Sequence, residues 1–218
     1  MHVRSRMTRN PITITKQTTI AEALELMRKH NIRRLPVMEK DKLIGIVTDR
    51  DLSEVSPSPA TSLSVFEINY LLAKMKISDV LPKHQEIFTI EPDAYVEEAA
   101  IIMREHKVSA LPVLEYGKLV GIITETNIFD AFIDLLGVKE TGCRITLEVE
   151  DKPGILANVT EIIRSEGTNI SRVAVFREEE KTFLVIRLTT YDVAPIIRLL
   201  KNAGYKIHSY KSYSEYTE

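Results

Sequence analysis

The chain repeats itself, without a gap, at an interval of 76 residues: residues 20–52 align with residues 96–128. The positions that recur 76 residues later are Glu22, Ala23, Met27, Arg28, His30, Leu35, Pro36, Val37, Glu39, Lys42, Leu43, Gly45, Ile46 and Thr48. A unit this long that occurs only twice does not make a solenoid, so it indicates one small module duplicated into a pair. A cleft between the two copies is therefore the first candidate for a small-molecule site.

Both copies predict the same order of elements. Thr19 and Glu22 can form a capping box at the start of an apolar stripe with helical spacing. Two short apolar runs then flank a polar turn, which is typical of a β-hairpin, and a second helix is expected after Thr48. We therefore expect a β-α-β-β-α order in each repeat, with one sheet covered by helices. In the second copy the expected elements are a helix near 96–106, strands near 111–115 and 119–123, and a helix over about 125–136.

The segments after each repeat have patterns of their own. Residues 56–62 contain two prolines and lead into a capping box at Ser64 and Glu67, which predicts an amphipathic helix in a structured connector. After the glycines 137 and 142, alternating and helical apolar patterns predict the order β-α-β-β-α-β, the ferredoxin-like order. The expected fold class is α/β (α+β), with a duplicated pair followed by a four-stranded ferredoxin-like domain.

Composition restricts the function classes. A net charge of −2 with 28% charged residues gives no field that would attract nucleic acid or an anionic membrane. Cys143 is the single cysteine, so no intrachain disulfide can form, and no apolar run approaches the roughly 20 residues of a membrane span. The five histidines lack metal-ligand spacing, and there is no glycine-rich phosphate loop or nucleophile motif. We expect a soluble, cytoplasmic protein without a metal site or catalytic residues.

The two stretches Gly-Ile-Val-Thr-Asp-Arg-Asp (45–51) and Gly-Ile-Ile-Thr-Glu-Thr-Asn (121–127), each preceded by Leu-Pro-Val, resemble the strand-to-helix corner of CBS domains. The tandem resembles the paired arrangement called a Bateman module. Asp-Lys-Pro-Gly-Ile-Leu (151–156) and Gly-Thr-Asn-Ile (167–170) resemble ACT domains, which are amino-acid-sensing modules. The expected domains are CBS repeat 1 at 1–56, a connector with an amphipathic helix at 57–76, CBS repeat 2 at 77–137 and an ACT domain at 143–218.

A first nucleotide pocket is expected at the corner of repeat 1. The hydroxyl and free backbone N–H of Thr48 at a helix start suit an anion, and Asp51 one turn later could accept hydrogen bonds from a ribose diol. Arg33 and Arg34 supply forks suited to phosphate. The resemblance assigns phosphate or ribose to Thr48, ribose to Asp51 and phosphate to Arg34, and places the base against Lys83, Ile87 and Phe88.

A second pocket is expected from Thr8, Pro11, Ile12, Ser109, Ala110, Thr124 and Asn127. Asn127 replaces the ribose-binding aspartate, and Ser109-Ala110 replaces the arginine pair, so nothing in this group would offset phosphate charge. We therefore favour the first pocket for a nucleotide. The second pocket is expected to hold an uncharged nucleoside, a sulfonium nucleoside such as S-adenosylmethionine, or nothing. Alternatively, the threonines and Asp51 only cap helices and both pockets are empty.

The ACT resemblance places an amino acid at a dimer interface, in contact with Asp151, Gly154, Ile155, Leu156 and Asn169. The alternative is that Pro-Gly only makes a turn and that the domain only dimerises. The order of domains resembles bacterial acetoin-utilisation regulatory proteins. The expected function is a non-catalytic, homodimeric regulatory sensor of AMP, ADP, ATP or S-adenosylmethionine that acts on an unknown partner protein and requires no cofactor. The alternative is an assembly subunit that dimerises without a ligand.

Overall fold

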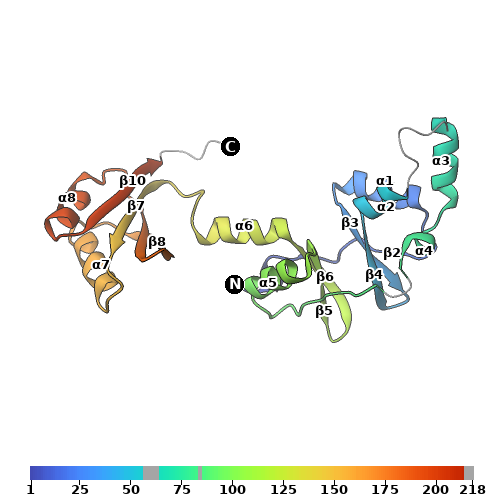
Figure 1. Cartoon of the computed structure of the whole chain (residues 1–218), viewed down its shortest axis with the longest axis horizontal. Helices are drawn as coiled ribbons and strands as arrows, with labels where there is room; N and C mark the ends of the chain where they lie inside the picture. The colour runs from blue at the N-terminus through green and yellow to red at the C-terminus, as the bar shows by residue number, and fades with distance from the viewer. Residues whose placement is uncertain (56–63, 83–84, 214–218) are drawn as a thin grey trace. The chain divides into compact units, whose positions relative to one another are not determined.

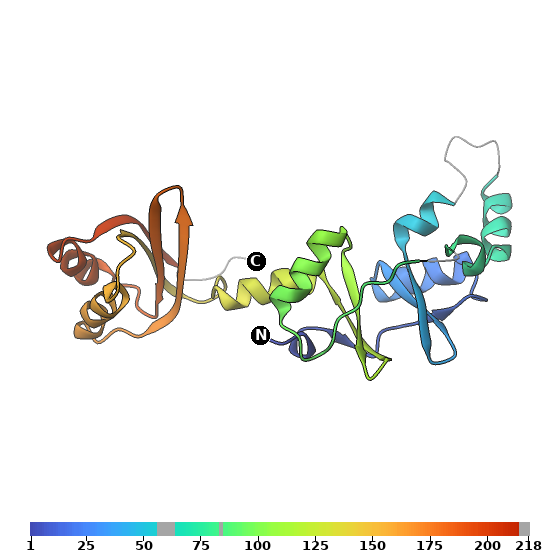
Figure 2. The same cartoon turned by 60° about the horizontal axis from the view of Figure 1, so that its bottom comes forward.

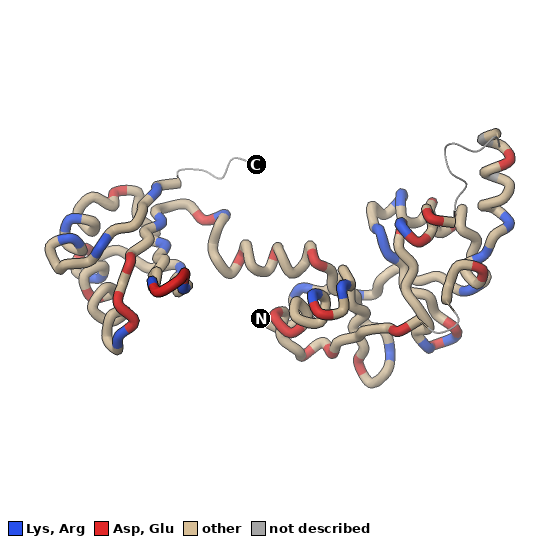
Figure 3. The backbone as a smooth tube through the Cα atoms, viewed as in Figure 1, with Lys and Arg blue, Asp and Glu red and all other residues tan. Residues whose placement is uncertain are grey.

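The computed structural model describes residues 1–55, 64–82 and 85–213. The chain divides into two compact units, Met1–Phe129 and Asp130–Glu218. Unit 1 contains both copies of the sequence repeat, and unit 2 contains the ferredoxin-like domain (Figure 1). Both units carry lysine and arginine as well as aspartate and glutamate along the chain (Figure 3).

The first repeat forms a three-stranded sheet in the order β2-β3-β4. Its strands are β2 (Ile14–Thr15), β3 (Arg34–Glu39) and β4 (Lys42–Thr48), and its helices are α1 (Ile20–His30) and α2 (Asp49–Glu54). The predicted capping box at Thr19 and Glu22 is confirmed at the start of α1. Helix α1 ends at Asn31, which adopts the left-handed conformation with φ 51°. The predicted hairpin is the antiparallel pair β3–β4.

The second repeat has the same helices and hairpin, but its third strand comes from the N-terminus and pairs with the second strand of the hairpin rather than the first. Its sheet has the order β1-β6-β5, built from β1 (Thr8–Arg9), β5 (Ala110–Glu115) and β6 (Lys118–Thr124). Helix α5 (Val96–His106) precedes the hairpin and α6 (Glu125–Leu135) follows it. A short 3-10 helix, η1 (Val3–Ser5), precedes β1. The chain therefore begins in one repeat's sheet and continues into the other repeat (Figure 2).

The connector contains α3 (Val65–Lys74) and α4 (Ile77–Val80). Ser64 and Glu67 form the predicted capping box, so the expected amphipathic helix is confirmed. Leu72 and Met75 pack against the core of the first repeat, whereas Phe66 is 86% exposed. The predicted proline-rich loop at 56–62 lies outside the described residues.

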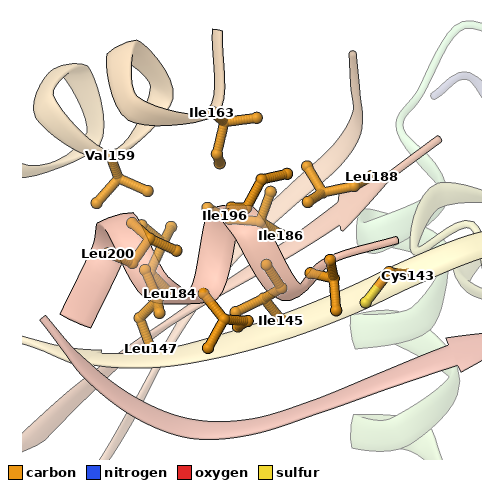
Figure 4. Close-up of a cluster of buried hydrophobic side chains, with 12 residues drawn as sticks. Cys143, Ile145, Leu147, Val159, Ile163, Leu184, Ile186, Leu188, Ile196 and Leu200 are labelled. Atoms are coloured by element: carbon orange, nitrogen blue, oxygen red, sulfur yellow. The ribbon is translucent and has the colours of Figure 1, made fainter. Parts of the chain in front are cut away.

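Unit 2 has the predicted order β-α-β-β-α-β. Its strands, β7 (Gly142–Val149), β8 (Ile170–Glu178), β9 (Lys181–Leu188) and β10 (Lys206–Tyr213), form one antiparallel sheet in the order β10-β7-β9-β8. Helices α7 (Ile155–Ser165) and α8 (Ala194–Asn202) pack on one face of this sheet. The core lies between the helices and the sheet, where β7 contributes Ile145 and Leu147 and α7 contributes Ile163 (Figure 4). The expected α/β (α+β) fold class is confirmed.

In the described part of the chain, every helix is too short or too polar to cross a bilayer. Cys143 is free and buried in the core of unit 2, and this burial raises the pKa of its thiol. A raised pKa leaves the thiol protonated and unreactive at neutral pH. Cys143 is thus a core residue rather than a nucleophile.

Candidate functional site

The corner after β4 is closed by a capping box between Thr48 and Asp51. The backbone N–H and the hydroxyl of Thr48 both donate to Oδ2 of Asp51, each at 2.8 Å, and the N–H of Asp51 donates back to the Thr48 hydroxyl at 3.2 Å. The expectation that the hydroxyl and N–H of Thr48 are free for an anion was therefore wrong, because both are used inside the corner. The second carboxylate oxygen of Asp51, Oδ1, is the acceptor that the corner presents to a ligand.

The equivalent corner after β6 has the same geometry with an amide in place of the carboxylate. The N–H and the hydroxyl of Thr124 donate to Oδ1 of Asn127 at 2.9 and 2.8 Å. Because Oδ1 accepts both bonds, the amide Nδ2 is the group that remains for a ligand. The first corner thus offers a negatively charged acceptor, and the second offers a neutral donor.

A first cavity of about 200 Å³ lies at the Asp51 corner. It contains residues of both repeats, so it is a cleft between the two copies. Five residues of the expected first pocket line it: Arg34, Thr48, Asp51, Ile87 and Phe88. Its other lining residues are Ile46, Gln85, Glu86, Lys107, Val108, Ser109 and Ala110. Lys83, which was expected here, lies outside the described residues.

The Gln85 side chain closes the sheet edge beside this cavity. Its Oε1 accepts from the N–H of Ile46 at 2.8 Å and its Nε2 donates to the carbonyl of Ile46 at 2.9 Å. In the second repeat the equivalent position, Ile122, pairs with Thr8 of strand β1. Gln85 therefore substitutes with one side chain for a strand that the first sheet lacks. The sequence repeat could not reveal this role, because Gln85 and its repeat equivalent Arg9 both precede the region of visible similarity.

A second cavity of about 730 Å³ lies at the Asn127 corner. Five residues of the expected second pocket line it: Thr8, Pro11, Ile12, Thr124 and Asn127. Its other lining residues are Asn10, His30, Asn31, Ile32, Arg33, Arg34, Ile122, Glu125 and Thr126. The arginine pair at the start of β3 therefore reaches this cavity.

Each cavity combines the corner of one repeat with residues that precede the hairpin of the other repeat. The expected assignment of three residues to the pockets was therefore wrong. Ser109 and Ala110 were expected in the second pocket, but they line the first cavity. Arg33 was expected in the first pocket, but it lines the second cavity. The physical reason is that the copies face each other, so the segment between the first helix and the hairpin of one repeat borders the corner of the other. Arg34 lines both cavities.

The face-to-face arrangement of the repeats also explains why the residues just after α1 and α5 line cavities that the sequence did not predict for them. Asn31 and Ile32 follow α1 and line the second cavity, while their repeat equivalents Lys107 and Val108 follow α5 and line the first. Asn31 and Lys107 both adopt the left-handed conformation at the helix end, with φ of 51° and 53°. These equivalent residues are 76 positions apart, so the repeat together with a face-to-face arrangement of the copies is the signal that predicts them.

A contact between the repeats holds Arg34. Its Nε donates to the hydroxyl oxygen of Ser109 at 3.1 Å, and its Nη2 donates to the same oxygen. Ser109 is a neutral partner, so the charge of Arg34 is not balanced by this contact. Arg34 is therefore positioned by the opposite repeat while its charge stays available to an anion in either cavity.

Charge and size distinguish the two cavities. In the first, the cations Arg34 and Lys107 stand against the carboxylates of Asp51 and Glu86, so the lining is balanced. In the second, Arg33 and Arg34 stand against a single carboxylate, Glu125. Only the second cavity falls within the roughly 300–1,000 Å³ that is typical of small-molecule sites. The second cavity therefore has both the room and the excess positive charge for an anionic ligand.

The first cavity also offers a surface for a flat ring. Phe88 stacks on His106 with ring centroids 3.7 Å apart and planes inclined by 17°. Ile87 and Val108 add apolar surface to the same lining. Among the described side chains, those of α3 do not line this cavity.

The expected amino-acid site of unit 2 lies at the start of α7 and the start of β8. Gly154 precedes α7 with φ 90°, a conformation that favours glycine, and a Cβ there would meet no atom within 4 Å. The Asp151 carboxylate accepts from Nε and Nη2 of Arg177 at 3.1 and 2.6 Å. Leu156 is 46% exposed, and the backbone carbonyl of Asn169 accepts from Thr189. The backbone conformation alone thus favours glycine at position 154.

Comparison with known proteins identifies the domains. The CBS domain family model matches residues 3–58 and 77–134, and the TTHA0829-like ACT domain model matches residues 141–210. The matched repeats contain both corners and the cavity residues. The chain belongs to the CBS-domain family, as a tandem CBS pair followed by an ACT-like domain.

Among the relatives, a CBS domain-containing protein of Dictyostelium discoideum is 36% identical over 136 residues, which cover 62% of this chain and 92% of that protein. A crystal structure described as an acetoin utilization protein (AcuB) of Vibrio cholerae has a TM-score of 0.51 and 32% identity, covering 63% of this chain and 94% of that one. An inosine-5'-monophosphate dehydrogenase of Korarchaeum cryptofilum is 34% identical over 122 residues, but these are only 22% of its length. The similarity to that enzyme is thus confined to the CBS part.

Proposed function

We propose that this chain is a non-catalytic regulatory protein that senses an adenine nucleotide or nucleoside in the CBS pair. The observation that carries the proposal is the pair of clefts between the repeats, each with a threonine-anchored corner that presents one polar atom to a ligand. Ligand binding would change how the repeats pack against each other, and signalling requires that the ligand favour one arrangement. The expected ligands remain AMP, ADP, ATP and S-adenosylmethionine.

The distribution of arginines changes which cavity we assign to a phosphate. We place the phosphate of a nucleotide in the second cavity, against Arg33 and Arg34, and its ribose at Asn127. In the first cavity the Asp51 carboxylate would accept from a ribose diol, and the Phe88 side would take the base. The smaller size and balanced charge of that cavity favour an uncharged nucleoside.

Binding calorimetry on the full chain tests this assignment. Arg33→Gln should weaken AMP binding about tenfold or more, because a hydrogen bond to a charged group is worth about 1.5–3 kcal/mol. It should leave adenosine binding unchanged, since adenosine has no phosphate. Arg28→Gln, an exposed charge change on α1, is the matched control and should change neither ligand. Equal loss of AMP and adenosine affinity in Arg33→Gln would contradict the placement of the phosphate.

We further propose that the protein is a cytoplasmic homodimer that pairs through strand β8. Strand β8 is at the edge of its sheet and carries exposed Val173 and Val175, and Leu156 of the sequence-predicted amino-acid site is exposed as well. An open apolar edge of this kind tends to pair with another strand. Val175→Lys should shift the molar mass measured by light scattering from dimer to monomer, while Val55→Lys, an exposed change elsewhere, should not. An unchanged mass in Val175→Lys would exclude β8 as the interface.

An amino acid in contact with Asp151, Gly154, Ile155, Leu156 and Asn169 would bind at that interface. The partner protein is expected to be a component of acetoin utilisation, a proposal supported by the similarity to the Vibrio cholerae protein. If AMP, ADP, ATP and S-adenosylmethionine all fail to raise the melting temperature at millimolar concentration, the chain is instead an assembly subunit that needs no ligand.

A further inference from the structure

Four cations form a row across the sheet of unit 2. In the strand register, Lys211 of β10 stands opposite Arg144 of β7, Arg144 opposite Arg187 of β9, and Arg187 opposite Arg172 of β8. Each of the four strands thus contributes one lysine or arginine at the same level. This row of Lys211, Arg144, Arg187 and Arg172 lies in a different unit from the nucleotide cavities.

The four side chains lie on the face of the sheet opposite the one that α7 and α8 cover. Side chains alternate between the two faces along a strand. The neighbours of Arg144 on β7 and of Arg187 on β9, such as Ile145 and Ile186, are in the core under α7 and α8. Arg144 and Arg187 therefore point to the opposite face. Residues directly opposite in a ladder share a face, which places Lys211 and Arg172 there too.

Such a row is unfavourable without a counter-charge. Like charges directly opposite each other in neighbouring strands destabilise a sheet, and here three such pairs occur side by side. One carboxylate, that of Glu140, forms an ion pair with the row, with its Oε1 2.6 Å from Nη2 of Arg172. Like charges that face each other without a stabilising partner are typical of a functional site, where a ligand supplies the opposite charge.

An aromatic ring holds part of the row in place. The Tyr213 ring centroid lies 5.3 Å from Cζ of Arg187 and 5.2 Å from Nζ of Lys211, within the range of cation–π attraction. Arg187 is only 9% exposed, whereas Arg172 and Lys211 are accessible to solvent. Arg187 is therefore a positioned, largely buried charge, and Arg172 and Lys211 at the two ends of the row are accessible.

We propose that this row binds a small molecule with at least two phosphoryl groups. Neighbouring strands are about 4.8 Å apart, so four cations on four strands span roughly 14 Å, more than one phosphate could contact. Arginine forks bind phosphoryl oxygens in pairs, and three of the four cations are arginines. The ligand's charge replaces the missing counter-charge, so binding relieves the repulsion within the row.

Pyrophosphate is the probe, titrated by calorimetry into the full chain and into an Arg33→Gln variant that weakens the second cavity of unit 1. The double variant Arg144→Gln/Lys211→Gln should lose at least tenfold in affinity in both backgrounds. Arg198→Gln, a cation of α8 on the helix-covered side, is the matched control and should bind as the parent does. Binding that disappears in Arg33→Gln and survives in the double variant would overturn the proposal and assign the anion to unit 1.

A second readout separates a binding role from a purely structural one. Because the row is self-repulsive, the double variant without ligand should have a melting temperature equal to or above that of the parent, and pyrophosphate should raise only the parent's. A lower melting temperature in the double variant would mean that these cations only stabilise the sheet. Binding of single-stranded RNA without any binding of pyrophosphate would likewise contradict the assignment to a small molecule.

Discussion

Asp51 and Asn127 occupy equivalent positions in the two repeats, but they give the two cavities different chemistry. Both side chains use one oxygen to close the corner, through the threonine three residues earlier. The group left to contact a ligand is a carboxylate oxygen at Asp51 and an amide N–H₂ at Asn127. A single substitution at this position should therefore change which ligand a cavity accepts.

Asn127→Asp should weaken AMP binding about tenfold or more in the full chain. The substitution keeps the size of the side chain and the bonds from Thr124, but it places a second carboxylate beside Glu125 in the cavity assigned to the phosphate. Calorimetry at low salt should show the loss for AMP and a much smaller change for adenosine. Equal AMP affinity in the variant and the parent would mean that the phosphate lies elsewhere.

At the residue scale, the sequence predicted the chemistry of the corners better than the assignment of side chains to cavities. The threonine–aspartate and threonine–asparagine pairs are local, so a four-residue spacing was enough to identify them. Arg33 and Ser109 were assigned to the wrong cavities because their positions depend on how the two copies face each other. Gln85 was missed because its bond to Ile46 joins residues that are 39 positions apart and share no motif.

Among the elements, α1 shows how a local signal defines a helix. The Glu22 carboxylate accepts from both the backbone N–H and the hydroxyl of Thr19, and these bonds lower the pKa of Glu22. A carboxylate whose pKa is lower in the folded state stabilises the fold above its unfolded pKa of about 4.5. That contribution is lost as the pH falls through the lower folded pKa.

Glu22→Gln should therefore make the stability of unit 1 less sensitive to acid. Between pH 6 and pH 3 the melting temperature of the parent should fall more steeply than that of the variant, because the variant has no proton to take up at this site. Glu25→Gln on the same helix is the matched control. A parallel decline in the parent and in Glu22→Gln would exclude a role for this carboxylate in acid sensitivity.

Helices and hairpins could be predicted from the sequence because their signals are local. The capping boxes at Thr19 and Ser64 are present, and the strand predicted from apolar alternation is β7, with Ile145 and Leu147 in the core. The two-residue strand β1 could not be predicted, since so short a segment has no periodicity and its partner β6 lies more than 100 residues away. The non-local pairing of β1 is what closes the sheet of the second repeat.

At the scale of the whole molecule, the two units have separate hydrophobic cores. The core of the first repeat contains Leu35 and Leu52, and the core of unit 2 contains Leu147 and Ile186. Both types of domain could be predicted from the sequence, because each carries its own apolar pattern and motif. A change in one core should therefore affect its own unit first.

Leu147→Ala should destabilise unit 2 by about 2–5 kcal/mol, the usual cost of truncating a fully buried leucine. The affinity of the full chain for AMP should stay the same at a temperature where unit 2 is still folded. Scanning calorimetry should resolve an earlier transition for unit 2, and AMP should raise only the transition of unit 1. Loss of AMP affinity in this variant would show that the nucleotide site requires unit 2.

For unit 1 we propose that the clefts between the CBS repeats bind an adenine ligand, with the phosphate at the arginine pair. The most direct test is a calorimetric titration of AMP and adenosine into the parent chain and into Arg33→Gln. The parent should bind both ligands. Arg33→Gln should lose at least tenfold in affinity for AMP and should bind adenosine as the parent does. Absence of binding of either ligand by the parent at millimolar concentration would contradict the proposal.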